Sequence, residues 1–267
     1  MRDENQAFDA ERLAHRLQAA WTERRPIEPF SETGDLTSPE QAYATQQAWA
    51  RLRAQDGETT VGRKIGLTSP GMQRQMGVDE PDYGDLWGSR QAIADDGLAR
   101  FDHGVFLQPR IEGEIAFLLG SDLEGPGVTP DAVRAAAVAA APALEIVDSR
   151  IADWRIKLVD TIADDASYGG FALGAWSERL LAADLAAVEC SLHKGDEEIM
   201  RERGTAVLGS PLLAVAWLAD KLTSLGSGIR AGDIVLSGSF AGAVPAHATD
   251  TFTLRTAGEA ELSVHFD

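Results

Sequence analysis

The sequence predicts an α+β fold in which a short helical part, residues 1–60, precedes a β-rich body, residues 61–267. Apolar residues recur at helical spacing in the first part. From about Val61 onward, short apolar runs instead alternate with glycine and proline. The strand patterns do not alternate regularly with helical ones, so a doubly wound parallel sheet is not expected.

Two helices are predicted in the first part, over about residues 8–20 and 38–52. The second begins with the start signal Ser38-Pro39-Glu40. The link between them, residues 24–39, contains three prolines and is predicted to be a loop. The residues that recur at helical spacing are Phe8, Leu13, Leu17 and Ala20, then Ala42, Gln46, Ala50 and Leu52.

The body is predicted to contain several strands and two clear helices. Residues 107–119 begin with alternating apolar residues and become continuously apolar, as a strand entering a core does. Residues 129–141 begin with a Thr-Pro cap and are predicted to be helical, and residues 142–149 form a buried strand. A second helix covers residues 210–226. The predicted closing strands are 233–239, 250–257 and 260–266, the last two joined by a tight turn at Gly258.

The bulk composition excludes some functions. With 24 basic and 42 acidic residues the net charge is −18, and no basic stripe is present to neutralise phosphates, so nucleic-acid binding is not expected. The chain has no run of eighteen apolar residues, and its N-terminus is polar, so neither a membrane span nor a signal peptide is expected. The single cysteine, Cys190, is expected to be a small core residue. These features indicate a cytoplasmic protein.

Two glutamates on one predicted strand are the first candidates for chemistry. In a strand, Glu112 and Glu114 point to the same face with their Cα atoms about 7 Å apart. Gly113 between them leaves the opposite face open or lets another backbone approach. Two carboxylates at about 4 Å repel by about 4 kcal/mol in a medium of dielectric constant about 20. Such a pair is explained by solvent on an edge strand, by a shared proton or by a bound cation.

A third glutamate favours the cation. Glu145 lies between leucine and isoleucine in a strand that looks buried on both faces, where a lone carboxylate is costly. Three oxygen ligands that leave coordination sites for water and substrate suit Mg²⁺ or Mn²⁺ rather than zinc. The sequence therefore predicts a divalent-metal site at Glu112, Glu114 and Glu145.

The chain resembles the 2-hydroxypenta-2,4-dienoate hydratase (2-keto-4-pentenoate hydratase) family within the fumarylacetoacetate-hydrolase-like superfamily. Each matching segment is a weak signal alone, but their order and spacing together are specific. The segments are GRKIGLTS (62–69), MGVDEPDYGDL (76–86), LQPRIEGEIAFLL (107–119), LEGPGVTPDAV (123–133), ALEIVDSRIADWRIKLVDTIADDAS (143–167), VLGSPLLAVAWLADKL (207–222) and GDIVLSGSF (232–240).

The resemblance implies a mixed β-roll body whose metal ligands fall on Glu112, Glu114 and Glu145. It also implies hydration of a 2-hydroxy-dienoic acid to a 4-hydroxy-2-oxo acid in the meta-cleavage degradation of aromatics, without an organic cofactor. A 2-oxo acid can chelate a hard cation, which then stabilises enolate charge. A homo-oligomer is expected on the same ground, and a complex with a decarboxylase or aldolase of the pathway is a further expectation.

Lys64 and Asp82 are the candidate proton-transfer residues. Lys64 lies in a predicted strand, and a lysine near a cation and apolar walls has a lowered pKa; the alternative is a surface lysine. Asp82 lies in a Pro-Asp-Tyr-Gly segment that by itself predicts an ordinary turn, and only the resemblance makes it catalytic.

Two glycine- or hydroxyl-containing segments are candidates for substrate binding. Ser237-Gly238-Ser239 follows an apolar strand, and its glycine would let backbone amides approach an anionic group; the alternative is a plain turn. Thr68 and Ser69 have the same status. Arg150, which follows Glu145 closely, is expected to form a structural ion pair with Asp148.

The chain departs from the family pattern at two places. Asp165 replaces a usual asparagine, and His247-Ala248-Thr249-Asp250 replaces Lys-Ala-Gly-Asp. If position 165 only caps a helix or forms a turn, aspartate substitutes for asparagine easily. If the usual amide donates to the substrate, activity or specificity differs, and the loss of a lysine at position 247 removes a positive charge that bears on some substrates. Neither change concerns the metal site.

Three other functions compete with a hydratase. A 4-oxalocrotonate decarboxylase would use a similar fold, metal and 2-oxo acid. A carbon–carbon hydrolase is disfavoured because no His–Glu pair is placed to activate water. A non-catalytic partner subunit is disfavoured because the three acids and Lys64 are all present.

Overall fold

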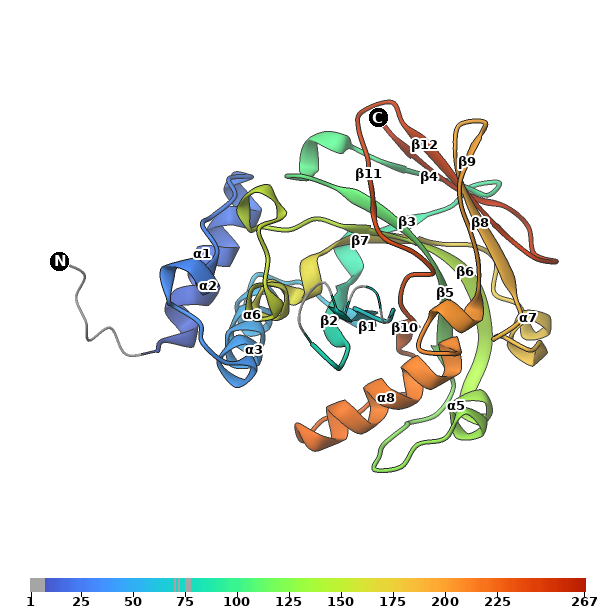
Figure 1. Cartoon of the computed structure of the whole chain (residues 1–267), viewed down its shortest axis with the longest axis horizontal. Helices are drawn as coiled ribbons and strands as arrows, with labels where there is room; N and C mark the ends of the chain where they lie inside the picture. The colour runs from blue at the N-terminus through green and yellow to red at the C-terminus, as the bar shows by residue number, and fades with distance from the viewer. Residues whose placement is uncertain (1–7, 70, 72, 75–77) are drawn as a thin grey trace.

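Two β-sheets and a group of N-terminal helices make up the chain, as the α+β prediction requires (Figure 1). The computed structural model describes residues 8–69, 71, 73–74 and 78–267. Met76 and Gly77, which begin one of the family motifs, lie outside the described residues.

The N-terminal part holds α1 (Ala10–Glu23), α2 (Phe30–Thr33) and α3 (Pro39–Gln55). The predicted cap of α3 is confirmed, because the Ser38 hydroxyl accepts the Gln41 N–H. The short α2 interrupts the link that its prolines predict to be a loop. Apolar residues of α1 join the same core cluster as the strands of the body, so the boundary near residue 60 stays a prediction.

The larger sheet is mixed and has the order β2-β1-β10-β5-β6-β7-β3, with β11 paired to β5 beyond β10. The β1–β10 and β3–β7 pairs are parallel and the other pairs of this sheet are antiparallel. Its strands are β1 (Thr60–Gly66), β2 (Asp82–Trp87), β3 (Gln91–Ile93), β5 (Arg110–Leu119), β6 (Ala137–Val147), β7 (Tyr168–Leu173), β10 (Ile234–Leu236) and β11 (Val244–Pro245).

The smaller sheet has the order β4-β13-β12-β8-β9 and packs against one face of β5 and β6. A Cβ added at Gly113 would lie 2.8 Å from Leu254 Cδ1 of this sheet. Side chains of the second sheet, rather than open space or another backbone, therefore occupy the face opposite Glu112 and Glu114. The strands are β4 (Leu98–Phe101), β8 (Glu189–Lys194), β9 (Glu197–Arg203), β12 (Thr251–Thr256) and β13 (Leu262–Phe266).

One helix prediction is wrong over its C-terminal part, residues 137–141. The Thr129 cap is present, but α5 covers only Pro130–Ala136, and β6 begins at Ala137. The alanine-rich run 137–141 pairs with β5 out to Leu119. Alanine favours a helix locally, but here the hydrogen bonds and burial of the central sheet outweigh that preference.

The remaining helices cover the sheets and connect their strands. The predicted helix over 210–226 is confirmed as α8 (Pro211–Ser224), capped by Ser210. The stretch 204–224 is long and apolar enough to cross a membrane by composition alone, but half of it is buried inside the protein, as in a core helix. The other helices are α6 (Leu158–Ala163) and α7 (Glu178–Ala182), with 3₁₀ turns at Gly88–Arg90, His103–Val105, Ala152–Trp154, Asp165–Ser167 and Gly204–Ala206.

Candidate active site

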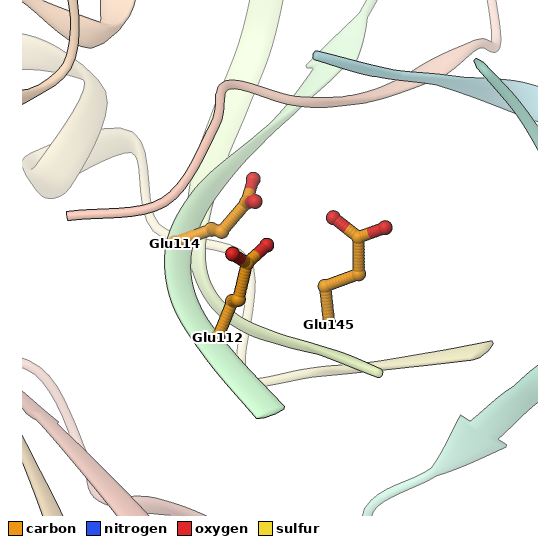
Figure 2. Close-up of side chains that lie close together, drawn as sticks. All are labelled: Glu112, Glu114 and Glu145. Carbon is orange, nitrogen blue, oxygen red and sulfur yellow. The ribbon is translucent and has the colours of Figure 1, made fainter. Parts of the chain in front are cut away.

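Three glutamates meet on the inner face of the larger sheet. The antiparallel register places Glu112 of β5 directly opposite Glu145 of β6, and Glu114 follows Glu112 on the same face of β5. One carboxylate oxygen from each lies within 4.8 Å of the others, and Figure 2 shows the three side chains directed toward one another. Glu114 and Glu145 have no exposed surface, and Glu112 is 7% exposed.

These carboxylates are hard to ionise. Burial is the larger cause, and repulsion between the glutamates is the second. Burial raises the pKa of Glu112 to about 8, and the neighbouring Glu145 adds to the shift. The pKa of Glu114 is raised well above its ordinary value by burial and by both other glutamates. The pKa of Glu145 is raised by burial, although Lys64 opposes the shift. Without a cation, the cluster binds protons at neutral pH.

The donor set fits a hard divalent cation. Glu114 Oε1 and both carboxylate oxygens of Glu145 accept no hydrogen bond from the described residues, although Lys64 Nζ lies 3.2 Å from Glu145 Oε1. Buried oxygens without donors are costly, and a cation would satisfy them. Three carboxylates with no nitrogen or sulfur donor suit Mg²⁺ or Mn²⁺.

Lys64 of β1 lies beside the triad. Its Nζ donates to the Ala166 carbonyl at 3.0 Å and pairs with Glu145, and the residue is 2% exposed, so it is not a surface lysine. Burial alone would lower the pKa of Lys64, but Glu145, Glu112, Asp82 and Glu114 outweigh it and raise the pKa. The expected lowering is therefore not found in this carboxylate-rich setting, and the amine is held protonated.

Asp82 lines the same cavity as Lys64 and Glu112. It is the first residue of β2 rather than part of a turn, because β2 pairs with β1 from Gly66 onward. Its Oδ2 accepts the Thr161 hydroxyl at 3.2 Å, while Oδ1 has no hydrogen-bond partner among the described residues. Burial raises the pKa of Asp82, and Lys64 opposes the rise. This carboxyl therefore holds a proton more readily than an exposed aspartate does.

A left-handed turn completes the wall behind Lys64. Asp165, Ala166 and Ser167 have φ values of 55°, 47° and 57°, a conformation that costs about 1–2 kcal/mol per non-glycine residue. The turn presents the Ala166 carbonyl to Lys64 and the buried Ser167 hydroxyl, which has no partner among the described residues, to the cavity.

Asp165 holds this turn against β2. Its Oδ1 accepts the Asp85 N–H at 2.7 Å, and its Oδ2 accepts the Trp87 Nε1–H at 2.9 Å. The side chain does not line the cavity. The first departure from the family pattern therefore lies at a turn contact, whereas the second, His247, is exposed.

The two predicted binding segments contribute unequally. Thr68 and Ser239 line the cavity. Gly238 donates its N–H to Glu114 Oε2 at 2.7 Å; its φ is 105°, and a Cβ there would lie 2.3 Å from Thr68 Cγ2. Ser237 donates its hydroxyl to the Ile115 carbonyl, and the Ser69 carbonyl accepts the Gln73 N–H; neither residue lines the cavity. The amide of Gly238 thus meets an anionic group, which is a glutamate of the triad.

A cavity of about 430 Å³ opens over Glu112, Lys64 and Asp82. Among the lining residues that sequence reasoning missed are Arg110, Trp154, Thr161 and Ser167. Only Arg110 gave a usable signal, since it precedes Glu112 by two residues on the same strand face. The other three come from the segment after β6, whose path no local pattern predicts.

The predicted ion pair between Arg150 and Asp148 is wrong, because Arg150 pairs with another acid. Its Nε lies 2.7 Å from Asp164 Oδ1, and its other nitrogens donate to backbone carbonyls, including that of Asp148. The Asp148 carboxylate instead accepts the N–H groups of Leu107 and Gln108. Cys190 is fully buried, as expected.

Comparison with known proteins gives a family. The fumarylacetoacetate (FAA) hydrolase C-terminal model matches residues 89–265. The chain is 41% identical to the 2-keto-4-pentenoate hydratase 2 of Dechloromonas aromatica (strain RCB), covering 98% of this chain and 99% of that one. It is also 41% identical to the 2-hydroxyhexa-2,4-dienoate hydratase of Comamonas testosteroni, with 96% and 97% covered.

The fold also matches solved structures. The 4-oxalocrotonate decarboxylase of Pseudomonas putida G7, complexed with magnesium and adipate, superposes with a TM-score of 0.92 at 31% identity, covering 98% of this chain and 100% of that one. This likeness confirms the predicted fold class. From the full-length identity to the curated relatives and the match of the family model, the chain belongs to the 2-keto-4-pentenoate hydratase family of the fumarylacetoacetate hydrolase superfamily.

Proposed function

We propose that this chain is a divalent-metal-dependent hydro-lyase that adds water to 2-hydroxypenta-2,4-dienoate, or to a substituted analogue, and yields a 4-hydroxy-2-oxo acid. The observation that carries the proposal is the buried triad beside Lys64, next to a cavity that Glu112, Lys64 and Asp82 line, in a chain of this family. The reaction belongs to the meta-cleavage degradation of aromatic compounds.

Glu112, Glu114 and Glu145 would hold Mg²⁺ or Mn²⁺. The unsatisfied oxygens of Glu114 and Glu145 support this assignment, as does the magnesium in the related decarboxylase structure. When bound, such a cation supplies Lewis acidity toward the carboxylate and neighbouring oxygen of a 2-oxo acid. The Gly238 amide fixes Glu114, and the Lys64 ammonium fixes Glu145, so both ligands are oriented before substrate arrives.

Lys64 and Asp82 would move the protons. Hydration requires the 2-hydroxyl proton to leave, a carbon of the diene to gain a proton, and water to add at C4 while C3 gains its proton. Asp82, with its free Oδ1 and raised pKa, can donate and recover a proton at carbon. Lys64, held protonated, would stabilise the negative charge that develops on the 2-oxygen.

Thr68 and Ser239, which line the cavity, would contact the substrate. Ser69, Ser237 and Gly238 were expected to do so, and their contact with substrate stays a prediction. The two curated relatives are hydratases of a five-carbon and a six-carbon acid, so both chain lengths are substrates to test. We further propose that the protein is a cytoplasmic homo-oligomer, with a pathway decarboxylase or aldolase as a candidate partner.

The test is metal-dependent turnover. The protein is dialysed against a chelator and titrated with Mg²⁺ or Mn²⁺, and 2-hydroxypenta-2,4-dienoate is followed by its dienol absorbance. We expect activity to disappear with the metal and to return with it. Turnover indifferent to metal would overturn the proposal, and release of CO₂ from 4-oxalocrotonate without hydration would assign the decarboxylase reaction instead.

A further inference from the structure

A buried glutamine bridges the two elements that hold Asp82. Gln46 of α3 is 5% exposed and packs its amide into the protein interior. Its Nε2 group donates to the Tyr83 carbonyl at 2.8 Å and to the Ile162 carbonyl at 3.0 Å. Tyr83 belongs to β2 and Ile162 to α6, so one side-chain amide uses both of its hydrogens to join these elements.

This bridge lies one residue along the chain from the contact that fixes Asp82. Tyr83 directly follows Asp82 in β2. In α6, Ile162 directly follows Thr161, whose hydroxyl donates to Asp82 Oδ2 at 3.2 Å. The two elements are therefore tied twice, once by Gln46 and once by Thr161. A shift of α6 against β2 that breaks the Gln46 bonds would also move the Thr161 hydroxyl away from the carboxyl.

The second oxygen of Asp82 lies against β1. A Cβ added at Gly66 would lie 2.2 Å from Asp82 Oδ1 and 3.6 Å from Lys64 Nζ, so this oxygen occupies the space that a side chain would otherwise take. Oδ1 is buried and has no hydrogen-bond partner among the described residues. With Oδ2 held by Thr161, the carboxyl keeps Oδ1 alone for proton transfer.

We propose that Gln46 is a positioning residue for proton transfer, which holds β2 and α6 together so that Asp82 keeps Oδ1 at the reacting carbon. The inference rests on the proposed function, in which Asp82 moves a proton at carbon. Gln46 does not line the cavity, so it acts through Asp82 and not by touching the substrate. A displacement of about 1 Å at a reacting group lowers the rate by about 10²-fold, which sets the size of the expected effect.

Removing the two donors without changing the length of the side chain tests this proposal. In Gln46→Met, loaded with Mg²⁺ and assayed with 2-hydroxypenta-2,4-dienoate, we expect kcat to fall roughly 10- to 100-fold. KM and Mn²⁺ affinity should stay within about twofold of the wild type, because the cavity lining and the triad are unchanged. Gln47→Met, the same change at the exposed neighbour on α3, is the control and should alter none of the three quantities.

A double-mutant cycle separates positioning from a general loosening of the fold. Adding Gln46→Met to Asp82→Asn should lower kcat by less than about threefold further, because the group that Gln46 positions is already gone. An equal loss of kcat with and without Asp82, or a wild-type kcat in Gln46→Met, would overturn the proposal. If Gln46→Met does not fold, as judged by circular dichroism, Thr161→Val removes the second tie and should show the same dependence on Asp82.

Deuterium exchange gives the same comparison without hydration. Proton NMR in D₂O follows the loss of the C3 hydrogens of 2-oxopentanoate, which has no double bond to hydrate. If exchange depends on Gln46 and Asp82 as expected while 2-hydroxypenta-2,4-dienoate is not hydrated, only the proposed function is overturned. A wild-type protein that neither hydrates nor exchanges would overturn both proposals.

Discussion

Glu112 and Glu145 lie directly opposite each other across the β5–β6 pair, two acids at a cross-strand position where like charges destabilise a sheet. Both are buried, and Glu114 is the next residue on the same face. Lys64 and Arg110 offset only part of the cost, because the pKa values of both glutamates remain raised, so the pair is expected to bind protons or a metal cation. The predictions on metal binding and pH follow from this opposition.

Removing one charge of the triad should remove the metal and leave the fold. We expect Glu112→Gln or Glu145→Gln to weaken Mn²⁺ binding by about 100-fold or more, because losing even a partner of a metal ligand costs roughly 10- to 100-fold. Calorimetric titration measures the affinity, and circular dichroism checks the fold. Glu197→Gln, on exposed β9, is the matched control. Unchanged Mn²⁺ affinity in both triad variants would refute the metal assignment.

The metal-free protein should lose stability as pH rises. The pKa of Glu112 is raised from 4.5 to about 8 by burial and by Glu145, so the folded chain binds more protons than the unfolded chain between these values. The stabilising contribution is therefore complete below about pH 4.5 and is lost as pH rises toward 8. Buried Asp85 and Asp164, each with a pKa raised to about 6, act in the same direction.

Thermal unfolding from pH 5 to pH 8, with and without Mg²⁺, measures this effect. Mg²⁺ should stabilise most at the upper end, where its ligands are deprotonated. In Glu112→Gln the decline with pH should be shallower. Stability of the metal-free wild type that rises steadily over this range would contradict the assigned pKa directions.

Asp82 should matter for turnover rather than for metal. Asp82→Asn removes the proton-carrying group and should lower kcat by about 10²- to 10⁴-fold, with Mn²⁺ affinity nearly unchanged. Steady-state kinetics with 2-hydroxypenta-2,4-dienoate give kcat, and the exposed neighbour Asp79 provides the control Asp79→Asn. A drop in Mn²⁺ affinity that matches the drop in kcat would show that Asp82 acts through the triad instead.

Asp165 should matter for stability rather than for substrate. In Asp165→Asn one of the two accepting oxygens becomes an NH₂ group. That group would face either the Asp85 N–H or the Trp87 Nε1–H, donor against donor, and one hydrogen bond would be lost. We therefore expect the free energy of unfolding to fall by about 1–3 kcal/mol. Urea unfolding measures it, with Asp196→Asn in an exposed turn as the control. A raised KM at unchanged stability would mean that the side chain reaches the substrate.

The triad could be predicted because its signal is local. Strand alternation places Glu112 and Glu114 on one face, and the apolar setting of Glu145 indicates a buried acid in need of a partner. The opposition of Glu112 and Glu145 could not be predicted, since it depends on the β5–β6 register. The register also decides the alanines after Ala136. Their local pattern favours a helix, but pairing with β5 makes them the first half of β6.

Contacts made by backbone atoms or by distant segments were also beyond sequence reasoning. The pairing of Arg150 with Asp164 joins residues fourteen apart through a fold that no periodicity reveals. Arg110 lies within the motif LQPRIEGEIAFLL, but the Trp154 ring that packs against its guanidinium comes from a segment that the motif does not predict. Asp82 looked like a turn residue because proline and glycine flank it, yet pairing with β1 makes it the start of a strand.

The group that fixes Lys64 is a main-chain carbonyl, that of Ala166. A main-chain oxygen remains when its own side chain is replaced, so the anchor of the lysine depends on the path of the turn rather than on one side chain. Ala166 is buried and its φ is 47°, so a mutagenesis library aimed at broader substrate range should restrict this position to small residues that tolerate a left-handed conformation, such as glycine and asparagine. Insertions or deletions nearby, which would shift the carbonyl itself, are the changes that such a library must avoid.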